Sequence, residues 1–477
     1  MPSRDSRRGT LASSIVTRYK TLIDEGLLAP GERIRSVRDG AIEEGVSRNT
    51  IVEAYDRLVA LGYLEARPGS GYFVSRIRHD AVSDRPRHVA EAVDVVSLLR
   101  EQLEQHYEVR IGDGRPPPSW MEGSELGRQL CAPRPRLGGD DEIDHGYGSP
   151  WGYAPLRERI ALLLAERSIH ASPSQVLLTQ GANHALDLIV RHLLSPGDAV
   201  LVDSPGYYPL FGKLKLARVE MIGVERTSSG PDLDDLAAKA AAHGPKVFFT
   251  QSLAHNPTGS SINLSGAHRI LQLATRHDFL VVEDDPFADL LPASSPRLAA
   301  LDQLERVVYV SSFSKTLSAS LRVGYVAASA GVTAALRDLK MVSIVSTSDY
   351  VERIVYRLIA GGHYLRHLRR LKTRLETARR DAVATLETLG LSMPNAGAGG
   401  YYVWARLPPG VDELALARAA AIEGIFIAPG SVFMPDRNMQ AGALRVNVAY
   451  ASDPRFVAFM RSHLANERKA NAEGNPC

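Results

Sequence analysis

The stretch SFSKTLSASLRVGY, residues 312–325, sets Lys315 among small hydroxyl side chains and seven residues before Arg322. It overlaps the run VVYVSSF, residues 307–313, whose apolar character is typical of a buried strand. Ligands of α/β proteins bind beyond the carboxyl ends of such strands. Lys315 is therefore either a reactive amine or an ordinary solvated lysine at the start of a helix, and the surrounding sequence must decide.

The chain around this stretch alternates between two patterns. From about residue 156 onward, helical segments such as LRERIALLLAERS and DLDDLAAKAAA alternate with the apolar runs QVLLT, AVLVD, KVFFT, FLVVED and VVYVSSF. This alternation predicts an α/β fold in which helices cover a mostly parallel sheet. The polar segments QGAN, DSPGY, HNPTG, EDD and SFSK follow the runs directly, so chemistry is expected there.

In this order and spacing, the polar segments resemble the cofactor site of the fold-type-I pyridoxal phosphate enzymes, the aspartate aminotransferase family. The resemblance covers residues 147–450 and implies a large α/β domain with a smaller α+β lobe. It implies that Lys315 forms a Schiff base with pyridoxal 5'-phosphate, which requires an uncharged amine. By the same resemblance Asp284 pairs with the pyridine nitrogen, Asn256 donates to the ring oxygen, and Tyr207 stacks on the ring.

The resemblance also assigns residues to the charged ends of the ligands. The cofactor phosphate would be held by a helix N-terminus, a hydroxyl and a guanidinium, and the residues are Ala182, Asn183, Ser312 and Arg322. Tyr147 would reach the phosphate of the neighbouring subunit, which implies a homodimer. Arg445, in ALRVNVAY, would clamp the carboxylate of an amino acid.

One position departs from the aminotransferase pattern. The family commonly places a tyrosine three residues after the pyridine aspartate, where this chain has Phe287. The missing hydroxyl removes a donor to the ring oxygen, at an expected cost of about 1 to 2 kcal/mol in electronic tuning. Cofactor binding is expected to survive, with little or no transamination.

The opening stretch also fits another enzyme class. SFSK, residues 312–315, matches the Ser-x-x-Lys motif of penicillin-binding proteins and class A β-lactamases. The companion motifs Ser-Asp-Asn and Lys-Thr-Gly are both missing from the sequence. The β-lactamase interpretation is therefore excluded.

The first eighty residues follow a different pattern. Apolar residues at helical spacing over residues 11–25 precede two helices that are expected to begin at the caps Ser36 and Ser47. Two strand-like pieces then flank the turn PGSG, residues 68–71. With its specific part VSRNTIVEAYDRLVALGYLE, the segment resembles the winged helix-turn-helix of GntR-type transcription regulators over residues 11–75.

This second resemblance implies binding to operator DNA. The second helix of such a motif enters the major groove with its N-terminal side chains, so Arg48 and Asn49 are expected to read bases. The helix is expected to leave Arg48, Asn49, Thr50 and Glu53 near its exposed end. The residues implied at the DNA backbone or the minor-groove wing are Arg38, Ser47, Thr50 and Gly69. A purely structural or dimerisation role for this domain remains an alternative.

A charged segment with few apolar residues, RIRHDAVSDRPRH, suits a solvated tether between the two parts. The sequence therefore predicts a DNA-binding domain at residues 1–77 and a linker at 78–107. It also predicts an aminotransferase-like domain at 108–465 and a C-terminal tail at 466–477.

A GntR-like head joined to an aminotransferase-like body is the arrangement of MocR-type regulators, which the chain resembles over nearly its whole length. The resemblance implies a regulator that binds operator double-stranded DNA and senses an amine or amino acid through external aldimine formation at Lys315. It also implies a homodimer in a head-to-tail, domain-swapped arrangement. An active aminotransferase with an ancillary DNA-binding domain remains the alternative.

Composition excludes several other classes. The chain has 44% hydrophobic and 23% charged residues, and no apolar run approaches the roughly 18 residues that span a bilayer. Its two cysteines, Cys131 and Cys477, support neither a disulfide framework nor a metal site. A cytoplasmic protein without a membrane partner is expected. The formal net charge of +2 means that any DNA-binding surface must be local.

Overall fold

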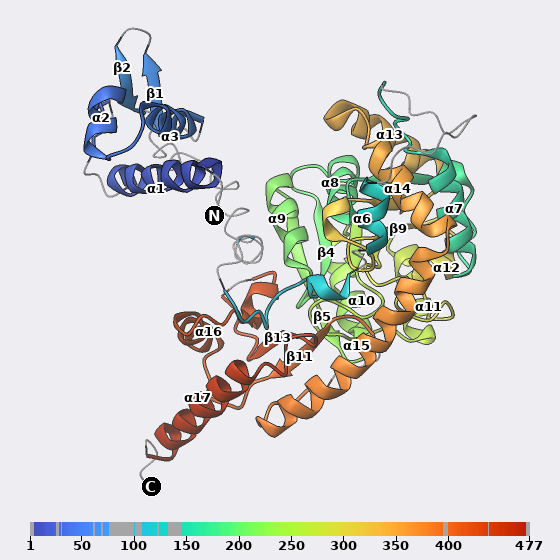
Figure 1. Ribbon diagram of the computed structural model, residues 1–477. Helices are drawn as coiled ribbons and strands as arrows, with labels where there is room; N and C mark the ends of the chain where they lie inside the picture. Colours follow the sequence, from blue (N-terminus) through green and yellow to red (C-terminus); the bar gives the residue numbers. More distant parts are fainter. Residues whose placement is uncertain are drawn as a thin grey trace. The chain divides into compact units, whose positions relative to one another are not determined.

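The computed structural model describes residues 4–24, 28–29, 31–60, 63–67, 70–75, 100, 107–121, 124–131, 146–394, 399–436 and 438–473 (Figure 1). The chain divides into two compact units, Met1–Pro86 and Arg87–Cys477, here called the head and the body. Gly69 and nearly all of the predicted linker lie outside the described residues. The predicted domain boundaries stay predictions.

The head is a small helical unit closed by a β-hairpin. Its elements are α1 (Arg4–Asp24), α2 (Val37–Glu43), α3 (Arg48–Ala60), β1 (Leu64–Arg67) and β2 (Gly71–Val74). Both predicted caps are present, because Ser36 Oγ accepts from the amide of Asp39 and Ser47 Oγ from that of Thr50, each at 3.2 Å. The antiparallel hairpin pairs Leu64 with Val74. Figure 1 shows α2, α3 and the hairpin together, as in a winged helix-turn-helix.

The body is built on an eight-stranded sheet in the order β3-β10-β9-β8-β7-β4-β5-β6. The strands are β3 (Val176–Thr179), β4 (Ala199–Ser204), β5 (Glu220–Thr227), β6 (Gly230–Pro231), β7 (Val247–Thr250), β8 (Leu280–Asp284), β9 (Val307–Ser312) and β10 (Gly324–Ala327). Only β10 and β6 pair antiparallel to their neighbours. The predicted mostly parallel α/β sheet is confirmed, and all five quoted apolar runs are strands. The pattern did not reveal β5 or β10.

Helices cover both faces of this sheet. They are α7 (Ala154–Ala165), α8 (Ala182–Leu193), α9 (Tyr208–Ala217), α10 (Leu233–His243), α11 (Leu264–Arg276), α12 (Leu298–Asp302), α13 (Ala330–Ile344) and α14 (Asp349–Ala360), with α6 (Ser124–Cys131) nearby in the chain. In β4, Val200 and Val202 belong to the core under α8 and α9, whereas Leu201 belongs to the core on the other face. This alternation follows from the two-residue period of a strand.

A smaller lobe follows in the chain. It contains α15 (His363–Thr388), α16 (Glu413–Ile422), α17 (Pro454–Glu473) and an antiparallel sheet of β11 (Tyr402–Arg406), β13 (Ala443–Asn447) and β12 (Ala428–Pro429). The segment that enters the body, residues 109–115, lies along this sheet. The amide of Gly112 donates to Phe426 O at 2.9 Å, and that of Asn447 to Ile111 O at 2.8 Å. None of the described helices is both long and apolar enough for a membrane crossing.

A buried ion pair fixes the end of β8. Arg297 Nε lies 2.8 Å from Asp285 Oδ2, and neither side chain is exposed to solvent. Tyr309 donates to the same carboxylate oxygen at 2.9 Å, and the Asp285 amide donates to Val310 O. Asp285 directly follows Asp284, the residue predicted to contact the cofactor. The ion pair of Arg297 and Asp285 therefore fixes the strand end at which Asp284 lies.

Removal of this guanidinium should destabilise the body strongly. Arg297→Met leaves the Asp285 carboxylate buried and unpaired, and the free energy of unfolding should fall by about 3 to 5 kcal/mol. All three tryptophans lie in the body, so their fluorescence during urea denaturation measures its unfolding. Arg306→Met is the matched control, because its partner Asp278 is 88% exposed and the pair contributes less than about 1 kcal/mol. Equal losses of unfolding free energy in the two variants would contradict a stabilising role for the buried pair of Arg297 and Asp285.

Candidate functional site

A cavity of about 560 Å³ lies at the carboxyl ends of the parallel strands, with one wall from the smaller lobe. Nine of the predicted residues line it: Ala182, Asn183, Tyr207, Asn256, Asp284, Ser312, Lys315, Arg322 and Arg445. They come from six separate segments of the sequence. The topology brings them together because parallel strands present their carboxyl ends at one edge of the sheet.

Lys315 lies on the loop after β9, with its ammonium group inside the cavity and hydrogen-bonded to the carbonyl of Gly114. Burial and, to a smaller extent, the nearby charge of Arg445 lower the pKa of Lys315 to about 8, against the opposing effect of Asp113. A larger fraction of this amine is therefore uncharged near neutral pH than for an exposed lysine. An uncharged amine can attack an aldehyde.

The smaller lobe fixes the backbone at this lysine. Tyr401 Oη donates to Lys315 O at 3.0 Å. On α15, Tyr364 Oη lies 2.7 Å from Thr316 Oγ1, and His367 Nε2 lies 2.8 Å from Thr316 O. The loop therefore has contacts with both lobes, and its position depends on the packing of α15.

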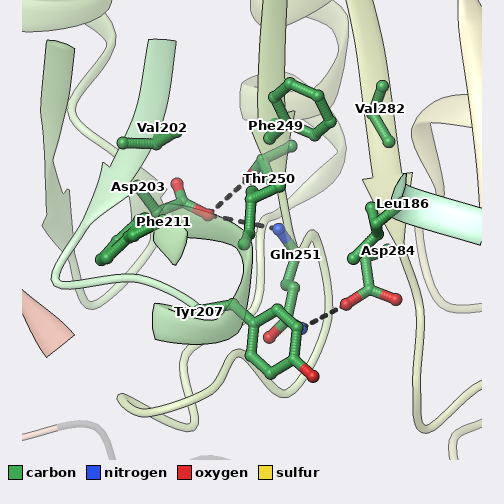
Figure 2. Close-up of a pocket in the computed structure, with 11 residues that line it drawn as sticks. Leu186, Val202, Asp203, Tyr207, Phe211, Phe249, Thr250, Gln251, Val282 and Asp284 are labelled. Atoms are coloured by element: carbon green, nitrogen blue, oxygen red, sulfur yellow. Dashed lines mark hydrogen bonds between the residues drawn. The ribbon is translucent and has the colours of Figure 1, made fainter. Parts of the chain in front are cut away.

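Asp284 ends β8 and is buried. Its Oδ2 accepts from Gln251 Nε2 at 2.6 Å, whereas its Oδ1 is buried without a hydrogen-bond partner among the described residues. Figure 2 shows Asp284, Gln251 and Tyr207 grouped at this edge of the sheet. The pKa of Asp284 is raised to about 7, chiefly by burial and also by the neighbouring Asp285, while the hydrogen bond from Gln251 and the charge of Lys315 oppose the rise. The unpaired oxygen fits a protonated ring nitrogen of a ligand.

Arg445, on β13, is buried beside Asn256. Its Nη1 donates to Asn256 Oδ1 at 3.1 Å, and its Nη2 to Gly112 O at 2.6 Å. The guanidinium also lies 4.8 Å from the ring centroids of Tyr402 and Phe433. No carboxylate of the described residues forms an ion pair with Arg445, and its Nε has no partner there. A buried cation in this state fits an anionic ligand such as a carboxylate.

The opposite end of the cavity has the character of an anion site. Helix α8 begins at Ala182 after Gly181, and no side chain caps its amide groups. Arg322 Nη2 donates to Gln180 O at 2.9 Å, and a Cβ on Gly181 would lie 2.7 Å from that nitrogen. The glycine therefore admits the guanidinium close to the helix N-terminus. Together with Ser312, this arrangement fits a phosphate group.

The remaining predicted residues lie elsewhere. Tyr147 does not line the cavity and is 86% exposed. Arg38, Arg48 and Asn49 are exposed on the head. The expectation that Thr50 lies at an exposed end is wrong, because it is 4% exposed and its hydroxyl lies 2.9 Å from Ser47 Oγ. All the assigned roles stay predictions.

The sequence did not reveal every residue of the cavity. Gln251, Gly114, Arg115 and Tyr402 also line it. Gln251 directly follows the run KVFFT, so the rule of strand ends covers it. No local pattern marks Gly114, whose carbonyl accepts from Tyr402 Oη at 2.7 Å.

Comparisons with known proteins agree with both parts of the chain. Residues 113–456 match the family model for aminotransferase class I and II, and residues 11–74 match that for bacterial regulatory proteins of the gntR family. The HTH-type transcriptional regulator TauR of Rhodobacter capsulatus is 31% identical, over 92% of this chain and 93% of its own. The HTH-type transcriptional regulator YdcR of Escherichia coli is 30% identical, over 87% and 90%.

Solved structures resemble the body. The α-aminoadipate aminotransferase LysN of Thermus thermophilus, complexed with N-(5'-phosphopyridoxyl)-L-leucine, has a TM-score of 0.69 and 26% identity, and the match covers 79% of this chain and 97% of LysN. The kynurenine aminotransferase of Pyrococcus horikoshii has a TM-score of 0.70 at 24% identity, over 83% and 97%. The second match concerns the fold alone.

Cofactor uptake should report the lowered pKa of Lys315. Because only the neutral amine attacks an aldehyde, the visible band formed on mixing cofactor-free protein with pyridoxal phosphate should appear faster as pH rises and level off above about 8. A lysine with an ordinary pKa near 10.4 would continue to gain rate. Stopped-flow absorbance measures this profile. Lys315→Ala should form no band, and a rate that climbs far beyond that pH would contradict the assignment.

Proposed function

Because the chain belongs to the aminotransferase class I and II family and joins that fold to a gntR-family head, we propose that its body senses an amine or amino acid and its head changes operator binding in response. The architecture is of the MocR type, and the chain is a transcription regulator that binds pyridoxal 5'-phosphate. With operator DNA as its partner, it acts in the cytoplasm.

The observation that carries this proposal is the pairing of two groups in one cavity. Lys315 is an amine with a lowered pKa, and Arg445 is a buried guanidinium that has no carboxylate of the described residues as its partner. An amino acid carries the two complementary groups, an amine and a carboxylate. Arg445 would bind the carboxylate through a forked pair of N–H groups, and Lys315 would exchange with the amine.

The cofactor fits the rest of the cavity. Bound there, pyridoxal phosphate supplies an aldehyde that condenses reversibly with amines and a ring that withdraws electrons. The unpaired Oδ1 of Asp284 would keep a proton on the ring nitrogen. Asn256 Oδ1 faces Arg445, which leaves Nδ2 to donate to the ring oxygen. Arg322 and the N-terminus of α8 would hold the phosphate.

The segment at residues 109–115 supports a route from the cavity towards the head. Gly112 accepts a hydrogen bond from Arg445, and Gly114 accepts one from Lys315. Both groups that an effector would engage therefore contact the stretch of chain that follows the linker. Effector binding would replace these contacts, shift the smaller lobe and alter the spacing of two heads, which must match the two half-sites of an operator.

The aminotransferase alternative is weaker. Phe287 occupies the position of the expected tyrosine and packs among Tyr401 and Tyr402, with ring centroids 5.7 and 5.8 Å away. It offers no hydroxyl to the cofactor. Sensing needs reversible binding of the amine, whereas turnover also needs efficient proton transfer, so this substitution favours a sensor.

A homodimer is part of the proposal. Tyr147 is 86% exposed, and the end of α13, the following loop and the start of α14 expose Met341, Val342, Val345 and Tyr350 by 46% or more. The chain at Gly148 lies against the end of this loop and the start of α14, since a Cβ there would lie 3.6 Å from Thr347 O and 3.3 Å from Asp349 Cβ. Apolar patches of this kind mark protein interfaces. In such a dimer Tyr147 would reach the phosphate of the partner, and the proposed arrangement is head-to-tail with swapped domains.

A panel of amines and amino acids tests the sensor. DNA fragments selected from random sequence for binding serve as operator, and fluorescence anisotropy measures their affinity with each compound. One compound should change both operator affinity and the absorption spectrum. Lys315→Ala should lose both responses and keep operator binding. Arg445→Gln should require about 10 to 100 times more of an amino acid effector, because it loses a charged hydrogen-bond pair.

Two results of this experiment would contradict the proposed sensor function. A response to amino acids that persists in Lys315→Ala would contradict the sensor role of the lysine. Sustained production of a keto acid in the same mixtures, over many turnovers per subunit, would favour the aminotransferase alternative.

Arg48 tests the role of the head. Arg48→Ala should weaken binding to the selected operator by about 5- to 150-fold, because a good arginine contact with a base is worth about 1 to 3 kcal/mol. The cofactor absorbance should not change. Arg57→Ala is the matched control on α3, because Arg57 is engaged with Glu53 and Ser13 within the head. Equal effects of the two substitutions would remove Arg48 from base recognition.

A further inference from the structure

One buried amide joins two of the predicted cofactor contacts. Gln251 lies directly after β7 and is 3% exposed. Its Nε2 donates to Asp284 Oδ2 at 2.6 Å, and its Oε1 accepts from the amide of Asn256 at 2.8 Å. Figure 2 shows the side chain of Gln251 between the strand end and Asp284. A single side chain therefore sets the position of both residues.

The backbone of Gln251 is itself held on both sides. Its amide donates to Asp203 Oδ2 at 3.2 Å, and its carbonyl accepts from Arg226 Nη2 at 2.7 Å. Asp203 and Arg226 form a buried ion pair with 2.9 Å between Oδ1 and Nη1. Thr250, the preceding residue, also donates to Asp203, at 2.9 Å. An ion pair beneath the site thus fixes the amide that touches Asp284.

We propose that Gln251 is a positioning residue for the cofactor, which acts by orienting the Asp284 carboxylate and keeping it ionised. The inference rests on the proposed cofactor placement at Asp284. With Oδ2 engaged by Gln251, only Oδ1 remains for the ring nitrogen. The same side chain holds the Asn256 backbone, so the two ring contacts keep a fixed spacing.

Charge supports this role. Burial raises the pKa of Asp284, and the hydrogen bond from Gln251 opposes that rise, with a net pKa of about 7. Loss of the donor would raise the pKa further, so that more of the carboxyl is protonated at neutral pH and cannot balance a protonated ring nitrogen. The charged and titratable groups around the two side chains are Asp203, Tyr207, Arg226, His255, Asp285 and Lys315.

Two substitutions separate this role from simple packing. Gln251→Leu removes the donor at every pH. Gln251→Glu keeps the shape but replaces the amide with a carboxyl, which can donate to Asp284 only while it is protonated. As pH rises the two adjacent carboxyls cannot both ionise, so Asp284 becomes harder to deprotonate. A packing role would leave Gln251→Glu like the wild type at every pH.

The experiment measures the dissociation constant of pyridoxal phosphate for the full chain by equilibrium dialysis across neutral pH, together with the absorption spectrum of the bound cofactor. Gln251→Leu should bind about 10- to 100-fold more weakly throughout. Gln251→Glu should bind nearly as the wild type at the acidic end and become progressively weaker than the wild type as pH rises. Gln175→Leu is the matched control, because Gln175 donates to Ala328 O at the other end of the sheet and its loss should not affect binding.

Asp284→Ala makes the outcomes distinguishable. If Asp284→Ala binds the cofactor as tightly as the wild type, the cofactor placement itself fails. If Asp284→Ala weakens binding but Gln251→Leu does not, only the positioning role of Gln251 is overturned. Should Gln251→Leu fail to fold, as judged by circular dichroism, the isosteric Gln251→Glu decides the question, and an affinity equal to that of the wild type at every pH would overturn the proposal.

Discussion

The cavity of the body is lined by more positive charge than negative charge. Lys315, Arg322 and Arg445 line one cavity, and Asp284 is the only carboxylate among the described residues of its lining. Arg445 is 1% exposed, and burial of a cation without a counter-ion is costly, so a ligand that brings negative charge would stabilise the cavity. A phosphate at one end and a carboxylate at the other meet this need, and the single aspartate matches a protonated ring nitrogen between them.

Much of this arrangement is predictable from the sequence, because a parallel sheet converts order along the chain into proximity in space. Five apolar runs and the polar residues behind them were enough to bring Asn256, Asp284 and Lys315 to one edge. The same rule applies to Gln251, which follows a strand directly. Its side chain has no titratable group, so the sequence alone gives no chemical reason to assign it a role. The Gly112 carbonyl could not be found in this way, because its bond to Arg445 spans 333 positions of the chain.

The head shows a different limit of sequence interpretation. Helical periodicity places Arg48, Asn49 and Thr50 together at the start of α3, and two of them are exposed as expected. Thr50 is buried because its hydroxyl and amide both engage Ser47. The N-cap residue Ser47 thus holds Thr50, three residues later, in a buried position. This local hydrogen bonding outweighs the pattern of apolar and polar positions in the sequence.

Residues 109–115 follow the predicted linker, and Gly114 and Arg115 in this segment form part of the wall of the ligand cavity. A Cβ on Gly112 would lie 2.5 Å from the backbone nitrogen of Ala428, so the segment fits tightly against the smaller lobe. For protein engineering, this tight fit limits where the two parts of a chimeric protein can be joined. Exchange of the DNA-binding module should splice upstream of residue 107, since a junction at residue 121 would remove part of the pocket along with the module.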